Sequence, residues 1–66
     1  MDIKDVRYNL DRTVVRNGTK YKLTGCTIRK NEKTGDFFYQ AEIREIGHVS
    51  WIICCSLDDI EEEIHD

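Results

Sequence analysis

Residues 21–55 most constrain the fold of this chain, because β-prone runs alternate there with polar turns. The clearest turn is the polar segment 30–36, with Gly35 near its end. It separates two runs rich in β-branched and aromatic residues, 21–29 and 37–44. Such runs are typical of strands, and a glycine that adopts positive φ suits a hairpin loop. The pattern predicts a long β-hairpin centred on this turn.

Two further turns extend the hairpin into an antiparallel meander of four strands. Asn17-Gly18 follows the short β-prone run 13–16, and this dipeptide is the strongest two-residue hairpin signal. A second polar turn at 45–48 precedes the strand 49–55. Gly25 interrupts the alternation of the strand that begins at Thr19, because Leu23 and Cys26 fall in opposite phases. A glycine at a reversal of facing predicts a β-bulge or a sharp bend.

A short helix is expected at each end of the chain. Apolar residues at positions 3, 6 and 10 have helical spacing, and Asp2 is a suitable N-cap. Leu57, Ile60 and Ile64 have the same spacing after Ser56, so residues 56–64 are expected to form one or two helical turns. The predicted fold class is mostly β with short terminal helices (α+β). We expect a four-stranded antiparallel meander curled into a small SH3-like or OB-like barrel, with an open sheet crossed by a helix as the alternative.

The predicted core takes one face of each strand and the apolar edge of the C-terminal helix. The strand 51–55 is apolar on both faces, so it is expected to be central or covered by the N-terminal segment. Burial of Trp51 predicts that its truncation to alanine costs about 3–5 kcal/mol. The full set of predicted core residues is Leu23, Ile28, Phe37, Tyr39, Ile43, Trp51, Ile53, Leu57 and Ile60.

A chain of 66 residues is expected to form a single domain, residues 1–66, with a core too small for high stability. The three cysteines, Cys26, Cys54 and Cys55, are odd in number and lack a Cys-x-x-Cys pair. This spacing disfavours a disulfide scaffold and a structural zinc site. We expect free thiols that behave as small buried hydrophobes, with no bound metal and no cofactor.

Charge is distributed unevenly along the chain. Residues 1–33 contain nine basic and four acidic residues, whereas residues 34–66 contain one basic and nine acidic residues. The acidic end either folds back on the basic half or presents a negative surface to a partner. The candidate partner surface consists of Asp58, Asp59, Glu61, Glu62 and Glu63.

A second candidate surface lies at the middle hairpin. Small β-barrels bind single-stranded nucleic acids through basic side chains and stacking aromatics. Arg29, Lys30 and Lys33, with Phe38 across the turn, supply both kinds of group. The acidic pI of about 5.3 argues against this function, because dedicated nucleic-acid binders are usually basic.

Catalysis is not expected, so the chain is predicted not to be an enzyme. The sequence has no Gly-rich phosphate loop and no nucleophile next to a suitable base. Cys54 and His48 are six positions apart on one predicted strand, which places them roughly 20 Å apart, beyond hydrogen-bonding distance. No apolar run is long enough to span a membrane, and the first residues do not resemble a secretory signal, so we expect a cytoplasmic protein.

The segments 23–30 (LTGCTIRK) and 35–42 (GDFFYQAE) resemble those of short uncharacterised proteins from prophages and mobile elements of gut-type Gram-positive bacteria. The resemblance covers about a third of the chain and implies a cytoplasmic accessory protein, phage-derived in origin. Together with the residue patterns, it favours a small protein-binding module that associates with itself or masks a host protein through its acidic face. A single-stranded nucleic-acid-binding barrel is the alternative.

Overall fold

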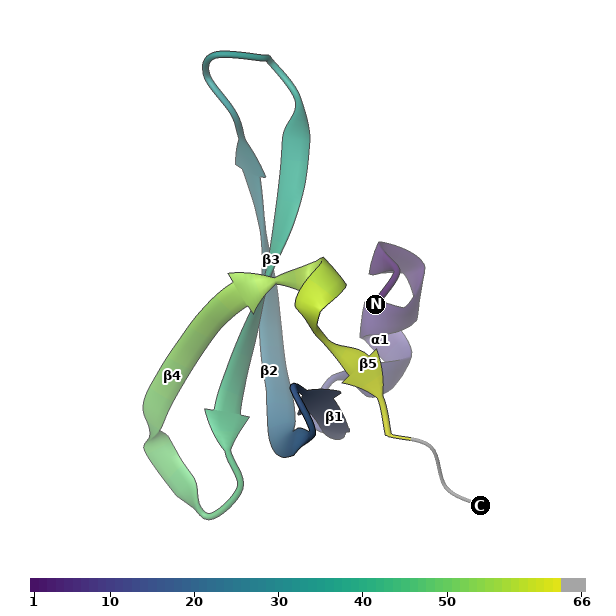
Figure 1. Ribbon diagram of the computed structural model, residues 1–66, viewed down its shortest axis with the longest axis vertical. Helices are drawn as coiled ribbons and strands as arrows, with labels where there is room; N and C mark the ends of the chain where they lie inside the picture. The colour runs from purple at the N-terminus through teal and green to yellow at the C-terminus, as the bar shows by residue number, and fades with distance from the viewer. Residues whose placement is uncertain (64–66) are drawn as a thin grey trace.

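The computed structural model describes the backbone of residues 1–63, and the side chains of residues 1–47 and 51–63. Five antiparallel strands form one open sheet in the order β4-β3-β2-β1-β5 (Figure 1). A 3-10 turn, η1, leads into the short helix α1, and a second 3-10 turn, η2, joins β4 to β5. The bounds are η1 Ile3–Asp5, α1 Val6–Asn9, β1 Thr13–Arg16, β2 Thr19–Lys30, β3 Phe37–Glu45, β4 His48–Ser56, η2 Leu57–Asp59 and β5 Glu61–Glu62.

The predicted hairpins and the N-terminal helix are confirmed. Asn17 and Gly18 join β1 to β2 with positive φ at both residues, 50° and 78°, as a type I′ turn requires. In the β2–β3 turn, Asn31 O accepts a hydrogen bond from Gly35 N at 2.7 Å, and Gly35 has φ of 77°. The predicted Asp2 cap is also present, since its carboxylate accepts a hydrogen bond from Lys4 N at 3.2 Å.

The predicted irregularity at Gly25 is a register shift between β2 and β3. Leu23 pairs with Ile43, but Gly25 pairs with the adjacent Glu42, so Thr24 is the extra residue. A Cβ atom at Gly25 would lie 2.7 Å from Glu42 Oε2. The absence of a side chain at Gly25 therefore leaves room for the Glu42 carboxylate at this point of the strand.

The predicted barrel is wrong, and only the first turn of the predicted C-terminal helix forms; Ile64, which the helical spacing included, lies outside the described residues. Within residues 1–63 the sheet has two free edges, β4 and β5, so it is not closed. Only the first turn after Ser56 is helical; Ile60 is already extended, with φ of −116° and ψ of 150°. The following residues form β5, which pairs Glu62 with Val14 of β1. The extended conformation is favoured over a helix because it buries Ile60 completely and gives the outer edge of β1 a pairing partner.

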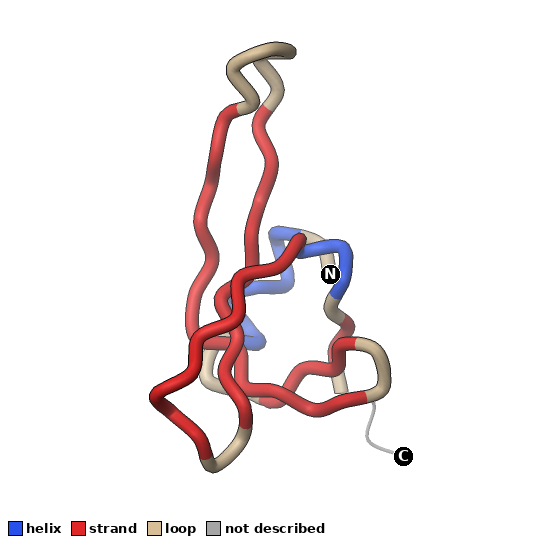
Figure 2. Tube along the Cα trace, turned by 60° about the vertical axis from the view of Figure 1, so that its left-hand side comes forward, coloured by secondary structure: helices blue, strands red, loops and turns tan. Residues whose placement is uncertain are grey.

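The core lies on one side of the sheet, under the N-terminal helix and the segment from η2 to β5 (Figure 2). Four predicted core residues, Leu23, Ile43, Leu57 and Ile60, are buried. Tyr39 and Ile53 are half-buried and pack against this core. The other buried apolar residues, which are absent from the list of predicted core residues, are Val6, Val14, Ala41 and Cys55; of these, Cys55 was expected to be buried as a small hydrophobic thiol.

Three predicted core residues are exposed instead. Ile28 and Phe37 have exposed fractions of 63% and 66%, because β2 and β3 extend beyond the elements that cover the sheet. Trp51 is 70% exposed. It lies where the β3–β4 ladder jumps from the pair Arg44–Ile52 to the pair Glu45–His48, so the alternation that predicted its burial is interrupted there.

The position of β4 also differs from the expectation. Its apolar sequence predicted a central or covered strand, but β4 is an edge strand that pairs only with β3 among the strands described. Among residues 51–56, the part of β4 whose side chains are described, only Cys55 is buried. No helix within residues 1–63 has the length and apolar character needed to cross a membrane.

Candidate binding surface

A two-stranded arm, residues 27–38, projects from the sheet (Figure 1). Every residue of this arm is exposed. It forms because β2 and β3 stay paired as far as Lys30 and Phe37, well beyond the last residues that the helices cover. The arm contributes to the longest dimension of the molecule, 39 Å, against 20 Å for the shortest.

The arm carries three large apolar side chains among basic ones. Arg29 lies directly opposite Phe38, and Lys30 directly opposite Phe37. Lys30 Nζ is 6.0 Å from the centroid of the Phe37 ring, which is within range for a cation–π interaction. Phe38 is 41% exposed. Ile28 lies on the same face of the arm as Phe37 and continues its apolar surface toward the sheet.

The structure brings together only part of the predicted nucleic-acid surface. Opposite residues of an antiparallel pair share a face, and successive residues of a strand alternate. Arg29 and Phe38 therefore lie on one face of the arm, whereas Lys30 lies on the other with Phe37. Lys33 is in the turn, where its backbone nitrogen donates to Asn31 Oδ1 at 3.0 Å.

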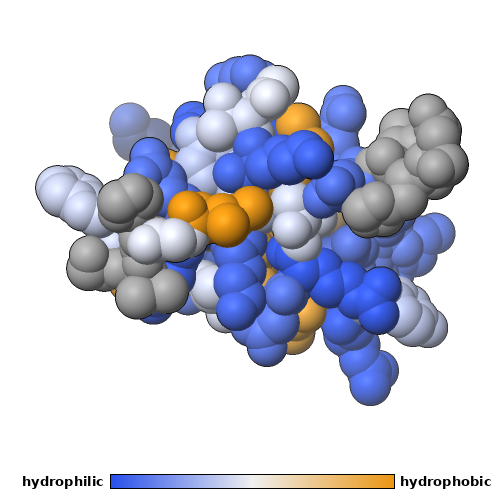
Figure 3. Space-filling view, turned by 90° about the horizontal axis from the view of Figure 1, so that it is seen from below, coloured by the Kyte–Doolittle hydropathy of each residue, from blue (hydrophilic) through white to orange (hydrophobic). Residues whose placement is uncertain are grey.

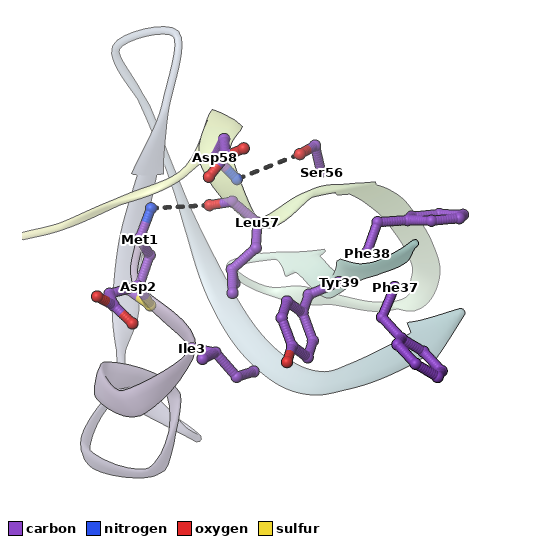
Figure 4. A pocket seen from close by; sticks show the side chains of 9 residues that line it. All are labelled: Met1, Asp2, Ile3, Phe37, Phe38, Tyr39, Ser56, Leu57 and Asp58. Carbon is purple, nitrogen blue, oxygen red and sulfur yellow. Dashed lines mark hydrogen bonds between the residues drawn. The ribbon is translucent and has the colours of Figure 1, made fainter. Parts of the chain in front are cut away.

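A cleft of about 560 Å³ opens at the base of the arm. Figure 4 shows Tyr39 facing Ile3 and Leu57 in the cleft, with the rings of Phe37 and Phe38 at its outer end. The N-terminal segment forms one wall, β3 the other, and residues 56–58 the back. The volume is within the range of sites that accept small ligands or a few side chains.

Two contacts hold the N-terminal wall of the cleft. The Met1 nitrogen donates to the carbonyl oxygens of Leu57 and Ile60, each at 2.8 Å. Asn9, which is buried, donates to Asp5 O at 2.8 Å and to Glu62 Oε1 at 2.9 Å. The two hydrogen bonds from Met1 and the one from Asn9 to Glu62 connect the N-terminal segment to the segment after β4.

The predicted acidic surface does not form one free cluster. Glu62 accepts the hydrogen bond from Asn9, and Glu63 forms an ion pair with Lys20 at 3.2 Å, with its side chain only 17% exposed. Asp58 lines the cleft, and Asp59 and Glu61 are exposed nearby. Part of the acidic end therefore folds back on basic and polar residues of the N-terminal half, which was one of its two predicted roles.

A second depression, of about 490 Å³, lies at the opposite end from the arm. It is lined by Lys22, Thr24 and residues 44–47, and it includes the exposed Ile46. Seen from this end, the molecule is mostly hydrophilic with small apolar areas (Figure 3). In the described part of its lining, this depression has no aromatic side chain.

The cysteines are free thiols with different environments. Cys55 is buried, as expected, Cys26 is half-buried, and Cys54 is exposed, contrary to the expectation. Burial raises the pKa of Cys26 and is also the main cause of the raised pKa of Cys55, which the Arg16 charge partly opposes. In the part of the chain that is described, no three His, Cys, Asp or Glu side chains converge as metal ligands would. The predicted separation of Cys54 from His48 involves a side chain outside the described ones.

Ile28 and Phe37 are binding candidates that the sequence analysis placed in the core. The sequence signal that could have predicted their exposure is strand length, because the run that contains β2 is much longer than the run that contains β1. A strand that overhangs its neighbour cannot be covered along its whole length.

Comparisons of the chain with protein-family models, curated proteins and solved structures gave no significant match.

Proposed function

We propose that this chain is a small protein-binding module that docks through the arm and the cleft at its base. The observation that carries the proposal is the exposure of Ile28, Phe37 and Phe38 on one projecting element. Ile28 and Phe37 adjoin on one face of the arm, and Phe38 is exposed on the other. Monomeric domains rarely leave adjoining large apolar side chains in water without a binding role, and aromatic residues are enriched at protein interfaces.

The charges on the arm indicate the kind of partner surface it fits. Arg29 and Lys30 flank the two phenylalanines, and Lys33 lies at the tip. A partner with an apolar groove bordered by acidic side chains complements this arrangement. The resemblance to prophage and mobile-element proteins makes a host-cell protein the expected partner.

Capture from a host-cell lysate with matched variants tests this function. The double variant Phe37→Ser/Phe38→Ser removes the exposed rings without opening the core, and Asp59→Asn/Glu61→Gln instead neutralises two exposed acids that do not line the cleft. We expect a partner that wild type and the acidic-residue variant retain and that the arm variant loses, while all three keep the same circular dichroism spectrum. Loss with the acidic-residue variant alone would assign binding to the acidic face.

Single-stranded nucleic-acid binding is the second candidate, and one observation favours it. Arg29 and Phe38 share a face of the arm, so a base stacked on the ring would have its phosphate near the guanidinium. Fluorescence anisotropy with short single-stranded DNA and RNA tests this function. Affinity that falls steeply with salt and is lost in Arg29→Gln and Phe38→Ser would support it. No change in anisotropy at low salt would eliminate it.

A further inference from the structure

We infer that two copies of this chain associate through their β4 strands, in antiparallel register, to form one continuous ten-stranded sheet. The interface is separate from the arm and does not depend on what the arm binds. The first observation is the position of β4 at an edge of the sheet, where no described segment pairs with its outer side. The backbone groups on that side are available to another strand.

The composition of β4 lacks the features that normally protect an edge strand. Residues 48–56 contain no Lys, Arg, Asp, Glu or Pro. Residues 52–56 pair regularly with β3, from Ile52 opposite Arg44 to Ser56 opposite Gln40. This segment is therefore a regular and uncharged template. The register irregularity lies on the N-terminal side of Ile52, outside the segment that would pair.

The exposed side chains of β4 favour contact with another strand. Trp51 and Ile52 are 70% and 49% exposed, and Cys54 is exposed as well. The sequence of this strand has the apolar character of an internal strand, but the single chain leaves it at an edge. A second copy makes β4 internal and places apolar side chains beside apolar ones.

The second copy is favoured over other occupants by self-complementarity and by the properties of the opposite edge. Antiparallel pairing of β4 with itself is two-fold symmetric and places no like charges opposite each other. The other edge, β5, has only two residues, both glutamates. Head-to-tail pairing of β4 with β5 is therefore poor, so association closes at a dimer and does not continue into a fibre.

The oligomeric state of the reduced protein, measured by sedimentation equilibrium over a wide concentration range, tests the inference. The pairing segment is short, so we expect a concentration-dependent equilibrium between a 7.8 kDa monomer and a species of twice that mass. Ile52→Lys introduces a charge at a half-exposed position of β4 and should weaken the dimer at least tenfold. Ile28→Lys makes the same change at a 63% exposed position on the arm and should leave the dimer unchanged.

Three results would overturn the inference. The first is a monomer mass at every concentration up to the millimolar range. The second is a dimer that Ile28→Lys disrupts and Ile52→Lys does not, which would place the contact on the arm. The third is a dimer that forms only when reductant is left out, which would make it a disulfide product. Hydrogen exchange adds an independent measure, because amides within residues 52–56 should become protected as concentration rises.

Discussion

Replacing Ile60 by alanine should destabilise the protein more than any similar deletion from an exposed position. Ile60 has no exposed surface and lies between η2 and β5, in the segment that the sequence predicted as helix. The change removes three carbon groups at about 0.8 kcal/mol each, or about 2.4 kcal/mol. The residual cavity adds roughly 1 kcal/mol more, for a total of about 3–4 kcal/mol.

This loss is large compared with the stability of so small a domain. At about 0.05–0.15 kcal/mol per residue, a chain of this length is stable by about 3–10 kcal/mol. For domains of this size, 1 kcal/mol shifts the melting temperature by about 4–8 °C, so a decrease of about 12–30 °C is expected. Far-UV circular dichroism is the suitable probe, because Trp51 is exposed and its fluorescence should change little on unfolding.

Two control variants make the result interpretable. Ile60→Val removes one carbon from the same site and should cost about 0.5–1.5 kcal/mol. Ile28→Ala makes the same deletion as Ile60→Ala at a 63% exposed position and should cost less than about 1 kcal/mol. If Ile60→Ala cost no more than Ile28→Ala, the segment after β4 would not be part of the core, and the placement of β5 would be wrong.

Three further predictions follow from single sites. Asn9→Ala loses both side-chain hydrogen bonds of a buried amide and should cost about 1–2 kcal/mol in urea unfolding; an unchanged midpoint would mean that the amide is solvated. Trp51→Ala should cost less than about 1 kcal/mol and leave the far-UV circular dichroism spectrum unchanged, because Trp51 is exposed. An unfolded variant would show that Trp51 belongs to the core after all. In alkylation followed by mass spectrometry, Cys54 should react before Cys55, because burial protects Cys55 and raises its pKa, which keeps the thiol protonated at neutral pH. Equal reactivity of the two thiols would show that the β4 end is open. The raised pKa also means that alkaline pH favours the unfolded chain, because the unfolded chain loses the thiol proton more readily than the folded state does.

The turns of the sheet were predictable because their chemistry is local. Asn17-Gly18 and Gly35 adopt the positive φ values that their loops need, whatever packs around them. The reversal of phase around Gly25 likewise indicated the bulge from the strand alone. The prediction that one face of β3 lies in the core is confirmed at Ile43 and in part at Tyr39, and the same face contains Ala41.

The candidate binding surface was predictable only in part. Phe38 beside Arg29 was found from its polar neighbours, and the structure pairs these two residues. Phe37 and Ile28 were assigned to the core because periodicity identifies a face but not the point along a strand where cover ends. That point depends on where η1 and η2 lie, and they are fixed by contacts between distant parts of the chain, such as Met1 with Leu57.

The hairpins, the facing of β2 and β3 and the N-terminal helix follow from the sequence, since these depend on dihedral preferences and hydrogen bonds within a few residues. Three features depend on long-range packing instead: the acidic segment after η2 is a strand, β4 is an edge, and residues 27–38 project into solvent. The helical spacing of Leu57 and Ile60 was real, but an isolated turn of helix is marginal in water. Pairing with β1 and complete burial of Ile60 outweigh it, and both depend on residues far away in the sequence.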